Sequence, residues 1–144
     1  MDDEERRAFE ALRRIMRAAD LYSRWLLREH HLTAPQLIIL TEIARHQEVP
    51  LGVLARATHM GSPTATGVVD RLERQGLVVR TRSESDRRRV FVALTEAGRR
   101  LVEKGPPLLS RRFRSEFHQL SPDRQRQVCE TLRHVADMME DGPE

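Results

Sequence analysis

The chain has 144 residues, about the length of one domain, so a second, catalytic domain is not expected. Hydrophobic residues make up 39% and charged residues 33%, which excludes intrinsic disorder and predicts a folded chain whose core can be shared between subunits. Lys and Arg total 25 against 22 Asp and Glu, and this net charge of +3 does not by itself indicate a nucleic acid partner.

The first predicted element is a long helix over residues 4–30, which contain no glycine or proline. Its apolar side chains recur at helical spacing in two adjoining stripes, Leu12, Ile15, Met16, Ala19, Tyr22 and Leu26 in one and Leu21 and Trp25 in the other. An apolar arc this wide needs more than one neighbour. The helix is therefore expected either to cross its own domain's core or to pack against another subunit.

A second helix is predicted over about residues 34–46, with Thr33 as N-cap and Gln36 reaching back to it in a capping box. A polar loop at 46–50 follows. A short helix is then predicted over 51–57, with an apolar face made by Leu51, Leu54, Ala55 and Thr58.

The next helix is predicted to begin with Ser62 as N-cap and Pro63 at the first helical position. Gly76 stands where a left-handed stop is expected. The inward face of this helix is formed by Ala65, Val68, Val69 and Leu72. Together with the short helix before it, it is a helix-turn-helix candidate.

Residues 77–82 and 90–94 are rich in β-branched side chains and predict a hairpin with a basic tip at 83–89. Thr95 is expected to cap a further helix. Gly105-Pro106-Pro107 should break or bend that helix. A helical face then resumes at Leu109, Phe113 and Phe117, and a last helix after Ser121-Pro122 carries Val128, Leu132, Val135 and Met139.

This order predicts a mainly α fold with a small β-wing (α+β), a winged helix-turn-helix inserted between helical arms. Residues 45–100 hold eleven arginines and six acidic residues, a net charge of +5, whereas the flanking segments sum to −2. The positive charge is therefore concentrated in the predicted winged segment, where it favours a DNA partner.

Small side chains occupy the exposed N-terminal end of the second helix of this motif, where a major-groove helix faces base edges: Ser62, Pro63, Thr64, Thr66 and Gly67. Arg71 and Arg74 lie further along it, within reach of phosphates. In the wing, Arg87, Arg88 and Arg89 are candidates for a minor groove, and Asp86 is expected to clamp the Arg88 guanidinium bidentately.

Three segments, residues 32–37, 62–78 and 86–98, resemble the MarR family of bacterial transcriptional regulators. The most specific is the Asp-x-Arg wing at Asp86–Arg88, followed by Leu-Thr-x-x-Gly at 94–98. The resemblance implies a homodimer with dimerisation helices at 1–31 and 96–144 flanking a DNA-binding lobe at 32–95. It also implies recognition helices in successive major grooves and Arg88 in the minor groove. Residues 11–21 resemble MarR-type regulators of compatible-solute (ectoine) operons.

Two features depart from the family pattern. Gly67 stands where a longer polar or basic residue is frequent, so one base contact is expected to be missing, and the break at 105–107 falls where one long helix is usual. The expected function is that of a sequence-specific double-stranded DNA-binding regulator. It is expected to be a repressor of a pseudo-palindromic operator, released by a small-molecule effector.

Other interpretations concern partners and cofactors. No apolar run exceeds five residues and the N-terminus is acidic, so a cytoplasmic protein without membrane partners is expected. No catalytic motif is present, and neither enzyme activity nor a cofactor or metal is expected. Tyr22 and Trp25 are either dimer core or the lining of an effector pocket. Cys129 is interpreted as buried or half-buried filler, with redox sensing through it as an alternative. A winged-helix protein-interaction module without DNA binding is the other alternative.

Overall fold

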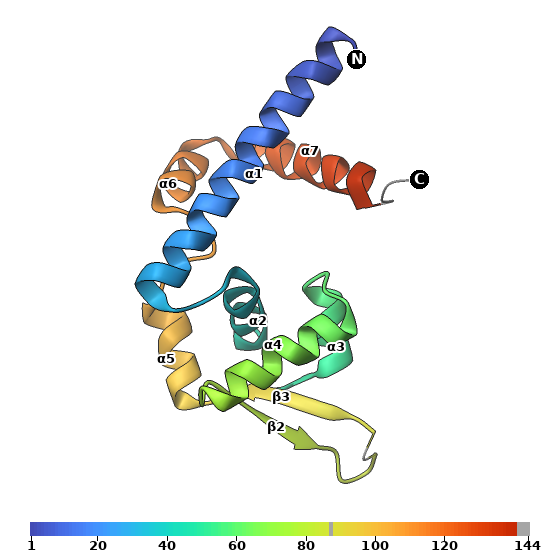
Figure 1. The fold of residues 1–144 in the computed structure, drawn as a ribbon, viewed down its shortest axis with the longest axis vertical. Coiled ribbons are helices and arrows are strands. Elements are labelled where there is room, and N and C mark those ends of the chain that lie inside the picture. The colour runs from blue at the N-terminus through green and yellow to red at the C-terminus, as the bar shows by residue number, and fades with distance from the viewer. Residues whose placement is uncertain (87, 141–144) are drawn as a thin grey trace. The chain divides into compact units, whose positions relative to one another are not determined.

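The computed structural model describes residues 1–86 and 88–140 (Figure 1). Its elements in chain order are α1 (Asp3–His30), α2 (Ala34–Ala44), β1 (Val49–Pro50), α3 (Leu51–Ala57), α4 (Ser62–Arg74), β2 (Val78–Arg82), β3 (Val90–Leu94), α5 (Glu96–Lys104), α6 (Arg111–Gln119) and α7 (Pro122–Glu140). The predicted fold class, mainly helical with a small sheet, is confirmed. The chain divides into two compact units, Met1–Leu108 and Leu109–Glu144.

The core of the first unit is built around α2. Four of its apolar side chains are at most 2% exposed, namely Leu37, Ile39, Leu40 and Ile43. They point in several directions around the helix, which is the pattern of a helix surrounded by neighbours. The buried Gln36 is satisfied by the capping box, in which its side-chain oxygen accepts from Thr33 N–H at 2.9 Å and its own N–H donates to the Thr33 hydroxyl at 3.2 Å. The predicted start of this helix is therefore confirmed.

The wing is part of a three-stranded antiparallel sheet with the order β1-β3-β2. The predicted hairpin is confirmed, with Val78 opposite Leu94 and Arg82 opposite Val90. The prediction of a polar loop over 46–50 was wrong for its last two residues, because Val49 and Pro50 form strand β1 and pair with β3. A strand of two residues is too short to show an alternating pattern in the sequence, and β1 is a strand only because it pairs with β3. Pro50 is tolerated because β1 lies at the sheet edge.

The start of α4 differs from the prediction by one residue. Gly61, not Ser62, is the N-cap, and no side chain caps the helix. The carbonyl of the extended Gly61 accepts the first helical bond from Ala65 N–H at 3.0 Å, so Ser62 is already helical and Pro63 follows it. The other end is as predicted: Gly76 has a left-handed φ of 74°.

The long helix α1 confirms the prediction for 4–30, but only its C-terminal turns reach the core. Leu26 is buried and Tyr22 and Trp25 pack against the core half-buried. Further back, Ile15 and Met16 are 53% and 63% exposed. Most of the predicted apolar arc is therefore uncovered within this unit.

The break at Gly105-Pro106-Pro107 is confirmed, because α5 ends at Lys104 and α6 begins only at Arg111. Leu109 consequently lies outside the helix predicted to carry it. The rings of Phe113 and Phe117 stack at 5.8 Å. In α7, Val128 and Val135 are half-buried while Leu132 and Met139 are exposed.

Cys129 is exposed, so its interpretation as buried or half-buried filler was wrong for the single chain. The prediction assumed that a side chain flanking Val128 would share its cover. A unit with so few helices covers only one side of α7, and Cys129 lies off that side.

Candidate nucleic-acid interface

The helix α4 separates its side chains as predicted. Ala65, Val69 and Leu72 are fully buried and Val68 is half-buried against the core. On the opposite side, Thr66 is half-buried and six further residues are exposed, namely Ser62, Pro63, Thr64, Gly67, Arg71 and Arg74. The candidate DNA-reading residues therefore lie on the solvent side of one rigid helix.

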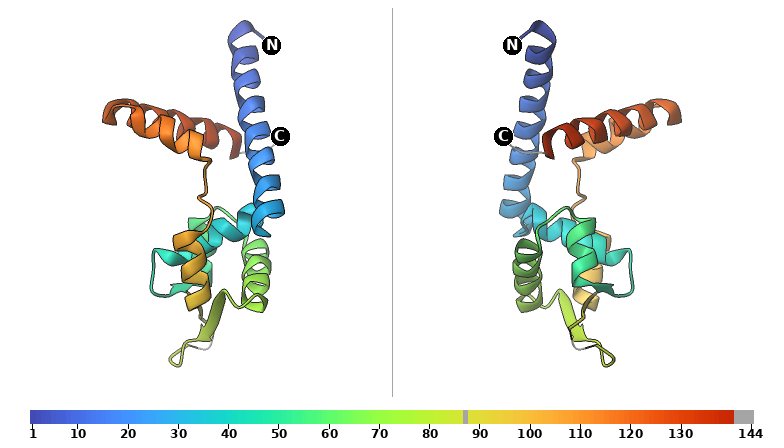
Figure 2. Two further views of the ribbon diagram at one scale, coloured as in Figure 1. Left: turned by 90° about the vertical axis from the view of Figure 1, so that its left-hand side faces the viewer. Right: turned by 90° about the vertical axis from the view of Figure 1, so that its right-hand side faces the viewer.

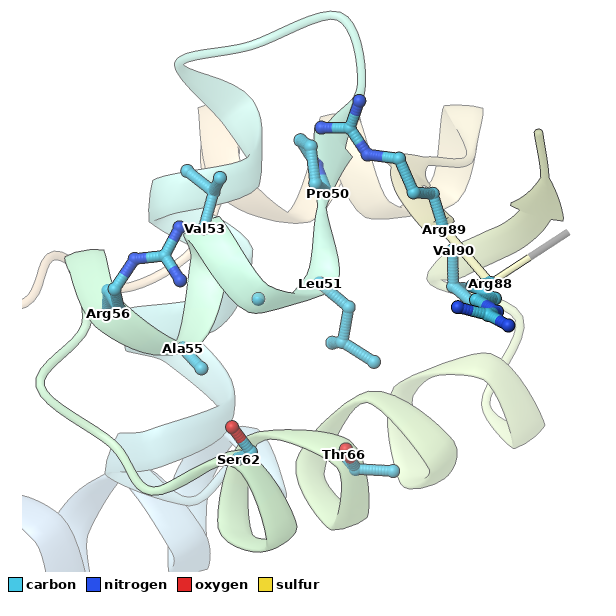
Figure 3. Close-up of a pocket in the computed structure, with 11 residues that line it drawn as sticks. Pro50, Leu51, Val53, Ala55, Arg56, Ser62, Thr66, Arg88, Arg89 and Val90 are labelled. Carbon is cyan, nitrogen blue, oxygen red and sulfur yellow. The ribbon is translucent and has the colours of Figure 1, made fainter. Parts of the chain in front are cut away.

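A hollow of about 410 Å³ lies between α3, the N-terminal half of α4 and the segment of the wing where the tip runs into β3 (Figure 3). Four predicted site residues line it, Ser62 and Thr66 from α4 and Arg88 and Arg89 from the wing. Its remaining walls come from the segment that contains β1 and α3. The structure thus brings the recognition helix and the wing to one concave surface. Thr64, Gly67, Arg71 and Arg74 lie outside the hollow, elsewhere on α4.

Arg56 also lines this hollow, and the sequence analysis missed it. It lies in the last turn of α3, the first helix of the helix-turn-helix. In this motif the first helix crosses the DNA backbone, which is where a guanidinium can contact phosphate. The position of Arg56 in the last turn of the helix predicted over 51–57 is the sequence feature that could have identified it.

The tip of the wing is held by a local turn, not by the expected ion pair. Asp86 Oδ1 accepts from the backbone N–H of Arg88 at 3.0 Å, and Ser83 Oγ accepts from Asp86 N–H at 3.3 Å. The prediction that Asp86 clamps the Arg88 guanidinium was therefore wrong. An aspartate that bonds the backbone two residues on is the more local arrangement. The predicted contact residue Arg87 lies outside the described residues.

Arg88 and Arg89 are both exposed but point in different directions (Figure 3). The Arg89 guanidinium lies 5.6 Å from the centre of the Phe91 ring on β3, a cation–π contact. This contact ties Arg89 to the sheet. Arg88 is therefore the better placed of the two to leave the wing for a DNA groove.

The recognition helix and the wing are joined by an ion-pair network that the sequence analysis also missed. Arg80 on β2 contacts Asp70 through Nη1 at 2.7 Å and Glu73 through Nη2 at 3.0 Å. The Arg80 N–H also donates to Glu73 Oε2 at 3.1 Å. The side-chain hydrogen bond from Arg80 lowers the pKa of Glu73, and the same bond raises the pKa of Arg80.

This ion-pair network predicts that the stability of the fold depends on pH in the acid range. A lowered pKa in the folded state means that Glu73 contributes stability above its ordinary pKa of 4.5, and that this contribution is lost as pH falls through the lowered value. Glu73→Gln should therefore unfold more readily than the wild type at pH 7, with the difference shrinking below about pH 4.5. Thermal unfolding of both proteins across pH 3–7 measures this. A difference that is constant with pH would contradict it.

Gly67 lies on the exposed side of α4, where a Cβ would meet nothing within 4 Å. The glycine at which the sequence departs from the family pattern therefore leaves open space on the exposed surface of α4. A side chain could be added there without displacing a neighbour.

Tyr22 and Trp25, predicted as dimer core or as pocket lining, are packed together at the end of α1. Their rings stack at 5.2 Å, the Tyr22 hydroxyl donates to the Pro107 carbonyl, and Trp25 meets the edge of His30 at 4.9 Å. These contacts fix both rings against the core of the first unit. A role in effector binding stays a prediction.

Two further features of the described residues concern metal ions and membranes. In residues 1–86 and 88–140, no three His, Cys, Asp or Glu side chains come together in a way that could hold a metal ion. Within the same ranges, none of the helices combines the length and apolar character that crossing a membrane requires.

Comparison with known proteins identifies the family. Residues 32–90 match the model of the MarR family. The HTH-type transcriptional regulator YfiV of Bacillus subtilis is 30% identical over 99% of this chain and 89% of its own length. The chain belongs to the MarR family. This MarR-family member is therefore a winged helix-turn-helix transcriptional regulator, and its predicted fold and class are confirmed.

Two other relatives extend the comparison. The homoprotocatechuate degradative operon repressor of Escherichia coli is 28% identical over 85% of this chain and 82% of its own length. The structure of Bordetella bronchiseptica BpsR, described in terms of the regulation of its DNA binding by 6-hydroxynicotinic acid, has a TM-score of 0.71. It is 28% identical, with 90% of this chain and 98% of BpsR covered. The first of these relatives is named as a repressor, and the second is described by its DNA binding.

Proposed function

We propose that this MarR-family protein is a dimeric repressor that binds a specific pseudo-palindromic operator in double-stranded DNA and is released by a small-molecule effector. The observation that carries the proposal is the single concave surface made by α4, α3 and the wing. Hydroxyl groups of the recognition helix and arginines of the wing share that surface. One lobe can therefore face a major groove and the flanking minor groove together.

Each predicted residue has a role in this arrangement. Ser62, Thr64 and Thr66 face base edges from the N-terminal half of α4, with Pro63 and the vacant Gly67 allowing close approach. Arg71 and Arg74 follow along the same helix and contact phosphates. In the wing, Arg88 enters the minor groove, with Arg87 and Arg89 adding positive charge beside it.

The proposed dimer uses the arms, helix 1–31 and segment 96–144, around the lobe 32–95. Support comes from apolar side chains left uncovered within each unit, at Ile15, Met16 and Leu21 of α1 and at Leu132 and Met139 of α7. Several large apolar side chains left exposed on one helix are typical of a surface that packs against another protein chain. Two lobes related by a twofold axis then meet half-sites about one helical turn apart.

Binding of the full-length protein to duplex DNA from its own upstream region tests the function. We expect protection of a pseudo-palindrome in a footprint, and an affinity that falls steeply with salt as counterions are released from several phosphates. An unrelated duplex of equal length is the control. Absence of protection at low salt would overturn the regulator proposal, and a salt-independent interaction with another protein would favour the protein-interaction module.

Thr64 is expected to control sequence preference more than affinity. Thr64→Ala removes an exposed hydroxyl and methyl at the reading end of α4, so discrimination against a changed base pair should fall by about 1 to 3 kcal/mol. Competition between the operator and single-base variants measures this change. Arg74→Gln is the matched control, because loss of a phosphate contact weakens binding to all sites alike. Unchanged discrimination would remove Thr64 from base reading.

Effector release is proposed to act through the spacing of the two recognition helices. A ligand between arm and lobe favours release only if it binds one spacing better than the other. The regulation of BpsR by 6-hydroxynicotinic acid supports an effector of this small size. Tyr22 and Trp25 are the proposed pocket residues. The compatible-solute assignment suggested by residues 11–21 is tested by the identity of the neighbouring genes.

A further inference from the structure

We propose that Arg80 is a positioning residue that locks the wing to the recognition helix, so that α4 and the wing engage DNA as one rigid body. The inference rests on the proposed function and adds to it a residue outside the reading surface. Figure 1 shows the wing strands β2 and β3 beside α4, and Figure 2 shows their hairpin extending from the lobe.

Arg80 is held at two points on α4. Asp70 and Glu73 are one turn apart on α4, so both carboxylates lie on the face turned toward β2. Arg80 reaches them with two different nitrogens, at 2.7 Å and 3.0 Å. A planar guanidinium that is held at two points is fixed in direction as well as in distance. The bond from Arg80 N–H to Glu73, at 3.1 Å, attaches the strand's main chain to the same carboxylate.

Arg80 lies just beyond the short turn that joins α4 to β2. Only residues 75–77 connect α4 to β2, and Gly76 among them has a left-handed φ of 74°. Leu72 and Val78 are buried on either side of this turn and anchor the base of the hairpin. Arg80 is two residues further along β2, opposite Val92. It therefore attaches β2 to α4 beyond this turn, on the side of the tip that carries Arg88.

The exposure and the charge of this network distinguish a positioning role from simple stabilisation and from phosphate binding. The three side chains are 30% to 40% exposed, and ion pairs in such positions stabilise a fold only modestly, so losing them lowers stability without unfolding the lobe. The Arg80 charge is matched by two carboxylates, so it is unsuited to binding a phosphate. Its loss should consequently change how the wing meets DNA without changing the number of phosphates neutralised.

The test is a double-mutant cycle between Arg80→Gln and Arg88→Ala in the full-length protein, with operator binding measured well below the unfolding temperature of each variant. We expect Arg80→Gln to weaken binding about tenfold, within the usual range for coupled contacts. Arg88→Ala, costly in the wild type, should cost less than about threefold once Arg80 is gone. The salt slope should stay at the wild-type value, whereas Arg74→Gln should reduce it by about 1.

A second variant, Asp70→Asn with Glu73→Gln, keeps Arg80 but removes both partners. General electrostatics predicts tighter DNA binding after the loss of two negative charges. Positioning instead predicts weaker binding and loss of minor-groove protection at the wing, with major-groove protection retained. This variant also decides the matter if Arg80→Gln does not fold.

Equal costs of Arg88→Ala in both backgrounds, or tighter binding by the Asp70/Glu73 variant, would overturn the role of Arg80 while leaving the regulator proposal intact. Failure of the wild-type protein to bind any duplex would instead overturn the proposed function itself. The two failures are therefore distinguishable in one set of measurements.

Discussion

Arg88→Ala should weaken operator binding by about 1 to 3 kcal/mol, a loss of roughly 5- to 150-fold in affinity. Arg88 is exposed, and the Asp86 carboxylate holds its backbone N–H at 3.0 Å. The turn thus fixes the start of the side chain and leaves its charged end available to DNA. Fluorescence anisotropy with a labelled operator at one fixed salt concentration measures the effect.

The matched control is Arg89→Ala, which removes the same charge from the next residue. Because the Arg89 guanidinium lies over the Phe91 ring, we expect a smaller loss of affinity. An isotherm unchanged by Arg88→Ala would exclude the wing from DNA binding. Equal losses for the two variants would show that only total charge matters.

Gly98→Ala should destabilise the first unit by about 1 to 3 kcal/mol or more. Gly98 is buried in the first turn of α5, where an added Cβ would lie 2.0 Å from the Leu77 carbonyl oxygen and 3.0 Å from its carbon. Those atoms belong to the backbone that leads into β2. The start of α5 and the Leu77 backbone would have to move apart. This movement would strain the two hydrogen bonds of the Thr95 hydroxyl, which accepts from Gly98 N–H at 3.1 Å and donates to the Gly76 carbonyl at 2.7 Å. Urea or thermal unfolding monitored by circular dichroism measures the loss.

Gly67→Ala is the control for this prediction, because it makes the identical change in another helix. No atom lies within 4 Å of the added Cβ, so only the gain in helix propensity of about 0.5 to 1 kcal/mol remains. The two substitutions should shift the unfolding midpoint in opposite directions. A Gly98→Ala protein as stable as the wild type would show that the approach of α5 to Leu77 is not tight.

Local chemistry explains what could be read from the sequence. The capping box at Thr33 and Gln36, the cap at Thr95 and the left-handed Gly76 each depend on residues within a few positions of one another. Helix periodicity placed the inward face of α4 correctly for the same reason. The exposed side of α4 could therefore be predicted almost in full.

The errors and omissions arise where distant parts of the chain meet or where two local arrangements compete. Strand β1 exists only because β3 lies beside it, and Arg80 finds Asp70 and Glu73 only after the sheet has folded back on α4. At Asp86, a backbone turn replaced the expected ion pair. At Ser62, the preceding Gly61 took the capping position. Cys129 was misplaced because burial depends on how much structure surrounds α7.

The vacancy at Gly67 has a consequence for how regulators of this kind diversify. A single substitution there would place a new side chain on the reading face of α4, where nothing obstructs it and most residues form helix better than glycine. Changes of function usually sacrifice stability, and a protein near its stability threshold tolerates few of them. At this position a duplicated copy of the protein could acquire a different operator without first needing a compensating mutation. The missing side chain thus leaves the lobe open to new specificity at little risk to its fold.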